Sequence, residues 1–182
     1  MSEFNSLEDY LKDKETKGDV FNFQSIQLCR KYNIENLDEF WDIYESYKGD
    51  KYLLEYPNKY KTLLRLDFDS DRPLSKRQYS QDTIFEIYSF ISKRYKNEEC
   101  CLLSKEFNNK EKDGFHLIFP NLFLNKQEQS TLTNDINKHF KDLLYICDNV
   151  SSKAWVLLES KKTTESSLYT YEYSIIGDKI IC

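Results

Sequence analysis

The chain has 182 residues, of which 40% are hydrophobic and 15% aromatic, so it can bury one core of ordinary size, and we expect a single domain over residues 1–182. Its formal net charge of −5 at pH 7 argues against nonspecific wrapping of nucleic acid around a globally basic surface, but leaves room for a local basic groove. No stretch approaches the roughly 20 apolar residues that span a bilayer, and five scattered cysteines without a C-x-x-C pair favour reduced thiols over a disulfide framework or a zinc site.

Two helices and two strands are predicted in the first 70 residues. Ser6 with Asp9 resembles a capping box at the start of a short helix. A second helix begins after Asn36, ends before Gly49, and has apolar side chains at helical spacing at Leu37, Phe40, Trp41, Tyr44 and Tyr47. Residues 52–57 and 62–69 are predicted to be strands.

The rest of the chain alternates helices and strands. Ser80 can cap a helix that continues to Tyr95, and the strands 101–107 and 114–120 are joined by a polar loop that indicates a hairpin. The remaining predicted elements are a helix near 126–140 and strands at 154–160 and 168–175. Strands paired in hairpins and mixed with helices predict an α+β fold.

The strand 62–69 runs directly into a cluster of carboxylates. Because residues two apart in a strand point the same way, Asp67 and Asp69 share one face. Two carboxylates on one face can hold Mg²⁺ or Mn²⁺, which prefer oxygen ligands and can clamp the attacking and leaving oxygens of a phosphoryl transfer. Acidic residues at a strand end also occur in solvated turns, as Asp71 suggests, so this motif alone leaves both interpretations open.

A second motif is the segment "KDGFHLIFP". If the strand extends back through the loop, Lys112, Gly114 and His116 point to one side. A lysine, a bare backbone and an imidazole on one surface would suit a triphosphate. The alternative for His116 is a hydrogen-bonded structural role, and His139 is expected on the surface of a polar helix.

A third motif is the segment "CDNVSSKAWVLLESKK". Asp148 precedes an apolar stretch that has Lys153 at one end and Lys161 and Lys162 at the other. Lysines at strand ends also commonly keep sheet edges soluble, so this segment has a structural interpretation as well.

In their order and spacing the three motifs resemble the archaeo-eukaryotic primase superfamily, most closely the primase module of nucleocytoplasmic large DNA viruses. The pattern of that module appears here as Leu66-Asp67-Phe68-Asp69, Gly114-Phe115-His116 and Cys147-Asp148, followed by Ser160-Lys161-Lys162. Flanking segments such as "RQYS" at 77–80 also look like the viral module. The resemblance covers about residues 17–175.

The resemblance implies an α+β primase fold whose mixed, mainly antiparallel sheet is RRM-like in its catalytic part and is flanked by helices. It implies a primase or primase-polymerase, a nucleotidyltransferase that makes short primers on single-stranded DNA during viral DNA replication. Asp67, Asp69 and Asp148 would hold the catalytic Mg²⁺ or Mn²⁺. The residues implied to contact the nucleoside triphosphate are Lys112, Gly114, His116, Lys153, Ser160 and Lys162.

The viral module is commonly joined to a superfamily 3 helicase. We therefore expect this chain to be the N-terminal part of a larger primase-helicase, or to work with a helicase domain in another chain. The N-terminus lacks the apolar stretch of a signal peptide, which predicts a soluble intracellular protein without a membrane partner. For a viral protein this means the host cytoplasm or a viral replication factory.

Three positions depart from the family pattern: Gly114 replaces a common serine, Lys153 a common arginine and Glu159 a common glycine. Two other functions stay open. A degenerate primase fold would bind nucleotide or single-stranded DNA without catalysis, and it would incorporate no nucleotide in a metal titration. A different metal-dependent phosphotransferase or nuclease would use the same carboxylates, and degradation of DNA without added nucleotides would indicate it.

Overall fold

The computed structural model describes residues 6–57, 60–96, 99–163 and 167–182. By its internal contacts the chain divides into two compact units, Met1–Asn58 with Lys153–Ser166, and Lys59–Ser152 with Ser167–Cys182. The expectation of a single catalytic domain over residues 1–182 stays a prediction.

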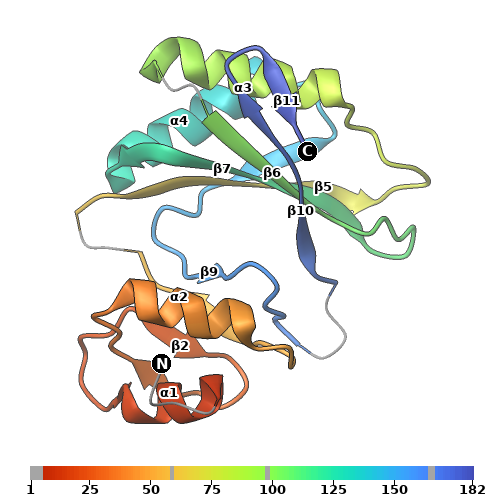
Figure 1. Ribbon diagram of the computed structural model, residues 1–182. Helices are drawn as coiled ribbons and strands as arrows, with labels where there is room; N and C mark the ends of the chain where they lie inside the picture. Colours follow the sequence, from red (N-terminus) through yellow and green to blue (C-terminus); the bar gives the residue numbers. More distant parts are fainter. Residues whose placement is uncertain (1–5, 58–59, 97–98, 164–166) are drawn as a thin grey trace. The chain divides into compact units, whose positions relative to one another are not determined.

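The first unit contains a small antiparallel sheet with strand order β1-β3-β2-β4-β9, together with two helices (Figure 1). The strands are β1 (Glu15–Thr16), β2 (Phe23–Ser25), β3 (Lys31–Tyr32), β4 (Leu53–Glu55) and β9 (Trp155–Val156), and the helices are α1 (Leu7–Asp13) and α2 (Leu37–Ser46). Both predicted helix starts are confirmed, because the Ser6 and Asn36 side chains accept hydrogen bonds from the third residue after each cap. Aromatic rings from both helices and the sheet fill the core of this unit.

The predicted strand 154–160 is wrong beyond Val156. Leu157 and Ser160 are joined by a backbone hydrogen bond of 2.9 Å, which closes a turn. The physical reason lies at Glu159, whose φ of 60° is in the left-handed region that a strand cannot contain.

The second unit contains a six-stranded antiparallel sheet with strand order β11-β10-β6-β7-β5-β8. The strands are β5 (Thr62–Pro73), β6 (Glu99–Lys105), β7 (Lys112–Leu124), β8 (Tyr145–Asp148), β10 (Tyr169–Ile176) and β11 (Lys179–Ile181), and the helices are α3 (Gln81–Tyr95) and α4 (Lys126–His139). Helices and mainly antiparallel sheets confirm the predicted α+β fold. The predicted hairpin of β6 and β7 is also confirmed.

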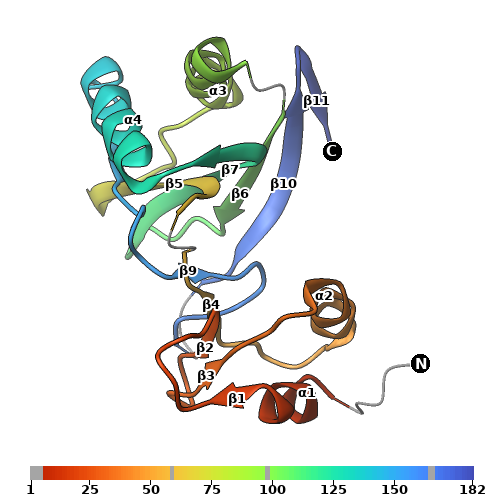
Figure 2. The same ribbon diagram turned by 90° about the vertical axis from the view of Figure 1, so that its left-hand side faces the viewer.

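Helices α3 and α4 cover one face of this sheet (Figures 1 and 2). Leu64, Leu66 and Phe68 of β5 are at most 1% exposed and pack in the core beneath these helices. Because side chains alternate along a strand, Asp67 and Asp69 point to the opposite face. We call this opposite face of the six-stranded sheet, which carries Asp67 and Asp69, the acidic face.

Strand β8 and the short strands β1, β2, β3 and β11 were not predicted from the sequence. Each has two to four residues, which is too short to show a hydrophobic period. In the described part of the chain no helix is long and apolar enough to cross a membrane.

Candidate functional site

The central feature of the acidic face is a pair of opposed carboxylates. In the antiparallel register of β5 and β8, Asp67 lies opposite Asp148, and Asp69 lies opposite Ile146. Side chains directly opposite each other have Cβ atoms about 5 Å apart, and like charges in that position destabilise a sheet. The structure therefore brings together two of the three predicted metal ligands from segments 81 residues apart, with Asp69 two positions along the same strand.

Strand β8 is held in this register by helix α4. The Asn137 side-chain amide donates to the Cys147 carbonyl at 2.9 Å, and its oxygen accepts from the Cys147 backbone N–H at 2.9 Å. The Cys147 side chain is 2% exposed, and burial, with the nearby Asp67 charge, raises the pKa of its thiol well above the ordinary value. The two hydrogen bonds from Asn137 and the packed Cys147 side chain thus hold the backbone next to Asp148 in place.

His116 lies on the other side of Asp67, in the register of β5 and β7. Its Nε2 is 3.2 Å from Asp67 Oδ1, and its ring stacks on Tyr169 with centroids 3.6 Å apart and planes 13° apart. Burial, followed by the charges of Asp69 and Asp67, raises the pKa of Tyr169 far above the ordinary value, so its hydroxyl stays protonated. His116 therefore has a structural contact and also faces the carboxylates, so both interpretations made from the sequence describe part of its surroundings.

Strand β7 does extend back to Lys112, which was the condition for placing Lys112, Gly114 and His116 on one side. Between Asp69 and Pro73, however, the register of β5 with β7 is irregular, because Gly114 pairs with Asp69 while Lys112 pairs with Pro73. Lys112 is exposed at this end of the strand. Its contact with a triphosphate stays a prediction.

Gly114 fits closely against the carboxylate strand. A Cβ atom at this position would lie 2.4 Å from Asp69 Oδ1, 2.6 Å from the Phe68 carbonyl oxygen and 3.1 Å from the Tyr169 hydroxyl. These distances show that position 114 has no room for a side chain in this structure. A serine would enter the space that the Asp69 carboxylate occupies.

We expect Gly114→Ala to lower the free energy of unfolding by about 1–3 kcal/mol, because overpacking against a backbone carbonyl cannot be relieved by a side-chain rotation alone. Because Asp69 must also move, Mn²⁺ affinity should fall with it. Thermal melting and Mn²⁺ titration measure the two effects. Gly18→Ala is the control, since its Cβ would meet nothing closer than 3.4 Å. A Gly114→Ala protein that melts and binds Mn²⁺ like the wild type would contradict this explanation.

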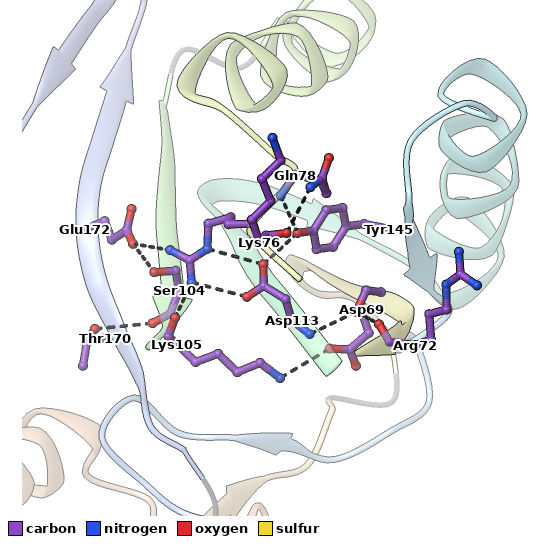
Figure 3. Close-up of polar contacts among 12 residues, drawn as sticks. Asp69, Arg72, Lys76, Gln78, Ser104, Lys105, Asp113, Tyr145, Thr170 and Glu172 are labelled. Carbon is purple, nitrogen blue, oxygen red and sulfur yellow. Dashed lines mark hydrogen bonds and ion pairs between the residues drawn. The ribbon is translucent and has the colours of Figure 1, made fainter. Parts of the chain in front are cut away.

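A buried polar cluster supports the acidic face, and sequence reasoning missed it (Figure 3). Asp113 is 1% exposed and accepts hydrogen bonds from Tyr145 Oη at 2.7 Å and from Arg77 at 3.3 Å, while Arg77 Nη2 also donates to the Lys105 carbonyl at 2.5 Å. The backbone N–H of Asp113 donates to Ser70 Oγ at 3.0 Å. We call Arg77, Asp113 and Tyr145 the clasp, because they join strands β6, β7 and β8 to the segment before α3. Arg77 belongs to the "RQYS" flank and Asp113 to the second motif, but nothing in either motif indicates that they pair.

The third group of predicted nucleotide-binding residues lies in the first unit. Lys153 and Lys162 are exposed, whereas Ser160 is 5% exposed and its hydroxyl accepts from the Leu53 N–H at 3.1 Å and contacts Tyr44 Oη at 2.8 Å. Ser160 thus has partners inside its own unit. The carboxylates belong to the second unit, so a joint nucleotide site for Lys153, Ser160, Lys162 and these carboxylates stays a prediction.

The structure also accounts for Glu159. Its φ of 60° lies in the left-handed region, which favours glycine. Its carboxylate accepts a 2.8 Å hydrogen bond from Lys51 Nζ, whose side chain is only 4% exposed. This bond lowers the pKa of Glu159. The carboxylate therefore serves as the counter-ion of a buried lysine.

The donor set of the acidic face suits a hard divalent cation, because it consists of carboxylate oxygens on adjacent strands. Across residues 6–57, 60–96, 99–163 and 167–182, no group of three or more His, Cys, Asp or Glu side chains gathers closely enough to hold a metal ion. The three aspartates supply the kind of oxygen donors that such an ion prefers, two of them at paired positions of β5 and β8. Metal binding at these residues stays a prediction.

A comparison with known families shows which family the chain resembles. Residues 25–175 match the family model described as AEP_C962R, the C962R protein N-terminal AEP domain, where AEP stands for archaeo-eukaryotic primase. The matched segment is well over half of the chain and includes the opposed carboxylates, His116 and the clasp. A search of curated proteins found no match.

Proposed function

The chain belongs to the archaeo-eukaryotic primase family, and from this premise we propose that it is a DNA-dependent primase or primase-polymerase. Its substrates are nucleoside triphosphates and a single-stranded DNA template, and its product is a short primer for viral DNA replication. The proposal includes an intracellular location, in the host cytoplasm or a replication factory, and a superfamily 3 helicase domain as partner in the same or another chain. The observation that supports this proposal most strongly is the pairing of β5 with β8. It places Asp67 opposite Asp148, with Asp69 two positions further along β5.

Asp67, Asp69 and Asp148 are the residues that would hold Mg²⁺ or Mn²⁺. When bound, such ions lower the pKa of an attacking hydroxyl and offset the charge of a leaving pyrophosphate. The chain itself fixes the three carboxylates through the packed faces of β5 and β8. Cation binding would then offset the repulsion that opposed carboxylates impose on the sheet.

The other residues of the acidic face bind and orient the nucleotide in this proposal. His116 donates a hydrogen bond to a phosphate oxygen, and the stacked Tyr169 ring holds its imidazole in place. Lys112 adds positive charge at the exposed end of β7, and Gly114 leaves room for the Asp69 carboxylate. A basic, aromatic surface elsewhere binds the template strand.

A primer-synthesis assay tests the proposal. The purified chain is incubated with a single-stranded DNA template, labelled nucleotides and either Mg²⁺ or Mn²⁺. We expect template-dependent products that are absent when the metal is chelated. Nucleotide or single-strand binding without any incorporation would instead indicate a degenerate primase fold. Degradation of labelled DNA in the absence of nucleotides would indicate a nuclease.

We expect His116→Ala to weaken nucleotide binding by about one to two orders of magnitude, because a charge-assisted hydrogen bond to phosphate is lost. The melting temperature should change much less, since the ring stack with Tyr169 contributes only about 0.5–1.5 kcal/mol. Single-strand affinity should barely change. Titration with nucleotide, titration with DNA and thermal melting of one variant measure all three.

His139→Ala is the matched control, because this histidine is exposed on α4. It should leave both affinities unchanged, and because its ring also stacks on a neighbour, Phe90, it shows how much the melting temperature falls when a stacked histidine ring is removed. An unaltered nucleotide affinity in His116→Ala, combined with a large drop in melting temperature, would assign His116 to the core and remove it from the nucleotide site.

A further inference from the structure

Lys105, which no motif includes, lies beside the carboxylates. It is the last residue of β6, and Leu103, two positions before it, pairs with His116. Its side chain is 14% exposed, its Nζ is 3.9 Å from Asp69 Oδ1, and it lies 5.6 Å from the centroid of the Tyr169 ring. Lysine is rarely so enclosed unless it is paired. Figure 3 shows its side chain extending toward Asp69.

The clasp fixes the backbone that carries Lys105. Arg77 Nη2 donates a hydrogen bond to the Lys105 carbonyl at 2.5 Å. The same guanidinium also donates to the buried Asp113 carboxylate. Burial and the hydrogen bond to Asp113 raise the pKa of Tyr145, so its hydroxyl stays protonated and continues to donate to that carboxylate. The backbone of Lys105 is therefore held in place by these hydrogen bonds at the end of β6, and from there its side chain extends to Asp69.

The surroundings of the ammonium indicate the ligand. Near it lie the Asp69 carboxylate and the Tyr169 ring, on whose face the His116 ring stacks. The absence of a Cβ at Gly114 lets the Asp69 carboxylate lie against the backbone of β7, within reach of Lys105. An anion that also coordinates a divalent cation can contact the ammonium and the carboxylate-bound ion together, and a polyphosphate has this chemistry.

We propose that Lys105 is a further nucleotide-contacting residue, whose ammonium pairs with Asp69 in the free protein and binds a phosphate oxygen when a nucleotide is bound. The inference rests on the proposed function. Because the same ammonium neutralises Asp69 in the free protein, it also competes with a divalent cation for that carboxylate. Lys105 thus lowers metal affinity before the nucleotide binds and raises nucleotide affinity afterwards.

Lys105→Met tests this inference, because it keeps the stem and removes the charge. In Mn²⁺ titrations without nucleotide, we expect affinity at least equal to that of the wild type, and up to about tenfold higher, since a nearby positive charge is gone. In titrations with ATP or inorganic tripolyphosphate at saturating Mn²⁺, we expect affinity to fall about tenfold or more. Lys105→Arg should retain most of the polyphosphate affinity because it retains the charge.

Lys110→Met is the control, because it removes the same charge from an exposed position in the β6–β7 connection. It should change neither affinity by more than about twofold. Unchanged tripolyphosphate affinity in Lys105→Met overturns the inference, and so does a parallel fall of Mn²⁺ and tripolyphosphate affinity, which would show a structural role. If the wild type binds no nucleotide with Mn²⁺, the proposed function fails and the inference fails with it. If the wild type binds nucleotide and Lys105→Met binds it equally well, only the assignment of Lys105 is wrong and the proposed function stands.

Discussion

Changing both Asp67 and Asp148 to asparagine is expected to lower nucleotide incorporation by about a thousandfold or more while the protein stays folded. The two carboxylates are directly opposed, and without their charge the acidic face loses most of its attraction for a divalent cation. A thousandfold loss corresponds to about 4 kcal/mol of transition-state stabilisation, which is within the range that bound metal ions supply. Primer synthesis and Mn²⁺ titration measure the two losses.

The melting temperature provides an independent check on this double variant. Removing like charges that face each other across two strands should leave stability equal or raise it by up to about 1 kcal/mol. Asp142→Asn, at an exposed position before β8, is the control for the loss of a carboxylate. Primer synthesis at the wild-type rate by the double variant would contradict the polymerase proposal.

Arg77→Met is expected to lower the free energy of unfolding by about 3 kcal/mol, because it leaves the Asp113 carboxylate buried with only part of its partners. The Asp113 side chain is 0% exposed and that of Arg77 28%, so solvent cannot fully replace the lost donor. In a chain of this length, this loss corresponds to a melting temperature lower by about 6–12 °C. Thermal melting at neutral pH measures it.

Two further variants separate the ion pair from the general loss of an arginine. Arg72→Met removes a neighbouring exposed arginine and should change the melting temperature by no more than about 2 °C. Adding Asp113→Asn to Arg77→Met removes the uncompensated charge and should restore part of the stability. A single Arg77→Met variant as stable as the wild type would show that the clasp does not support the sheet.

The helices could be predicted because their signals are local. Ser6, Asn36 and Ser80 each cap a helix through bonds to residues only three positions away, and these pairs can be seen directly in the sequence. Strand 154–160 could not be predicted correctly, because its apolar run conceals the left-handed conformation of Glu159. The partner of the Glu159 side chain is Lys51, 108 residues earlier in the chain, so this contact has no local signal either.

The types of site residue could be predicted, but their arrangement could not. The alternation of side chains along β5 indicated that Asp67 and Asp69 share a face. The burial of Leu66 and Phe68 on the other face agrees with this prediction. The opposition of Asp67 and Asp148 depends on β8 joining the edge of the sheet, which is a long-range pairing without a local signal. For the same reason Lys105 and the clasp were missed, since their partners lie on other strands.

Gly114 of the second motif and Asp69 of the first lie so close together that a side chain at position 114 would overlap the Asp69 carboxylate. The space that a side chain at position 114 would need is the space in which the Asp69 carboxylate lies. A serine at position 114 of this chain would therefore require both the Asp69 carboxylate and the Phe68 carbonyl to move. The two motifs are separate in sequence, yet in this fold a side chain added at position 114 of the second motif would meet the Asp69 carboxylate of the first.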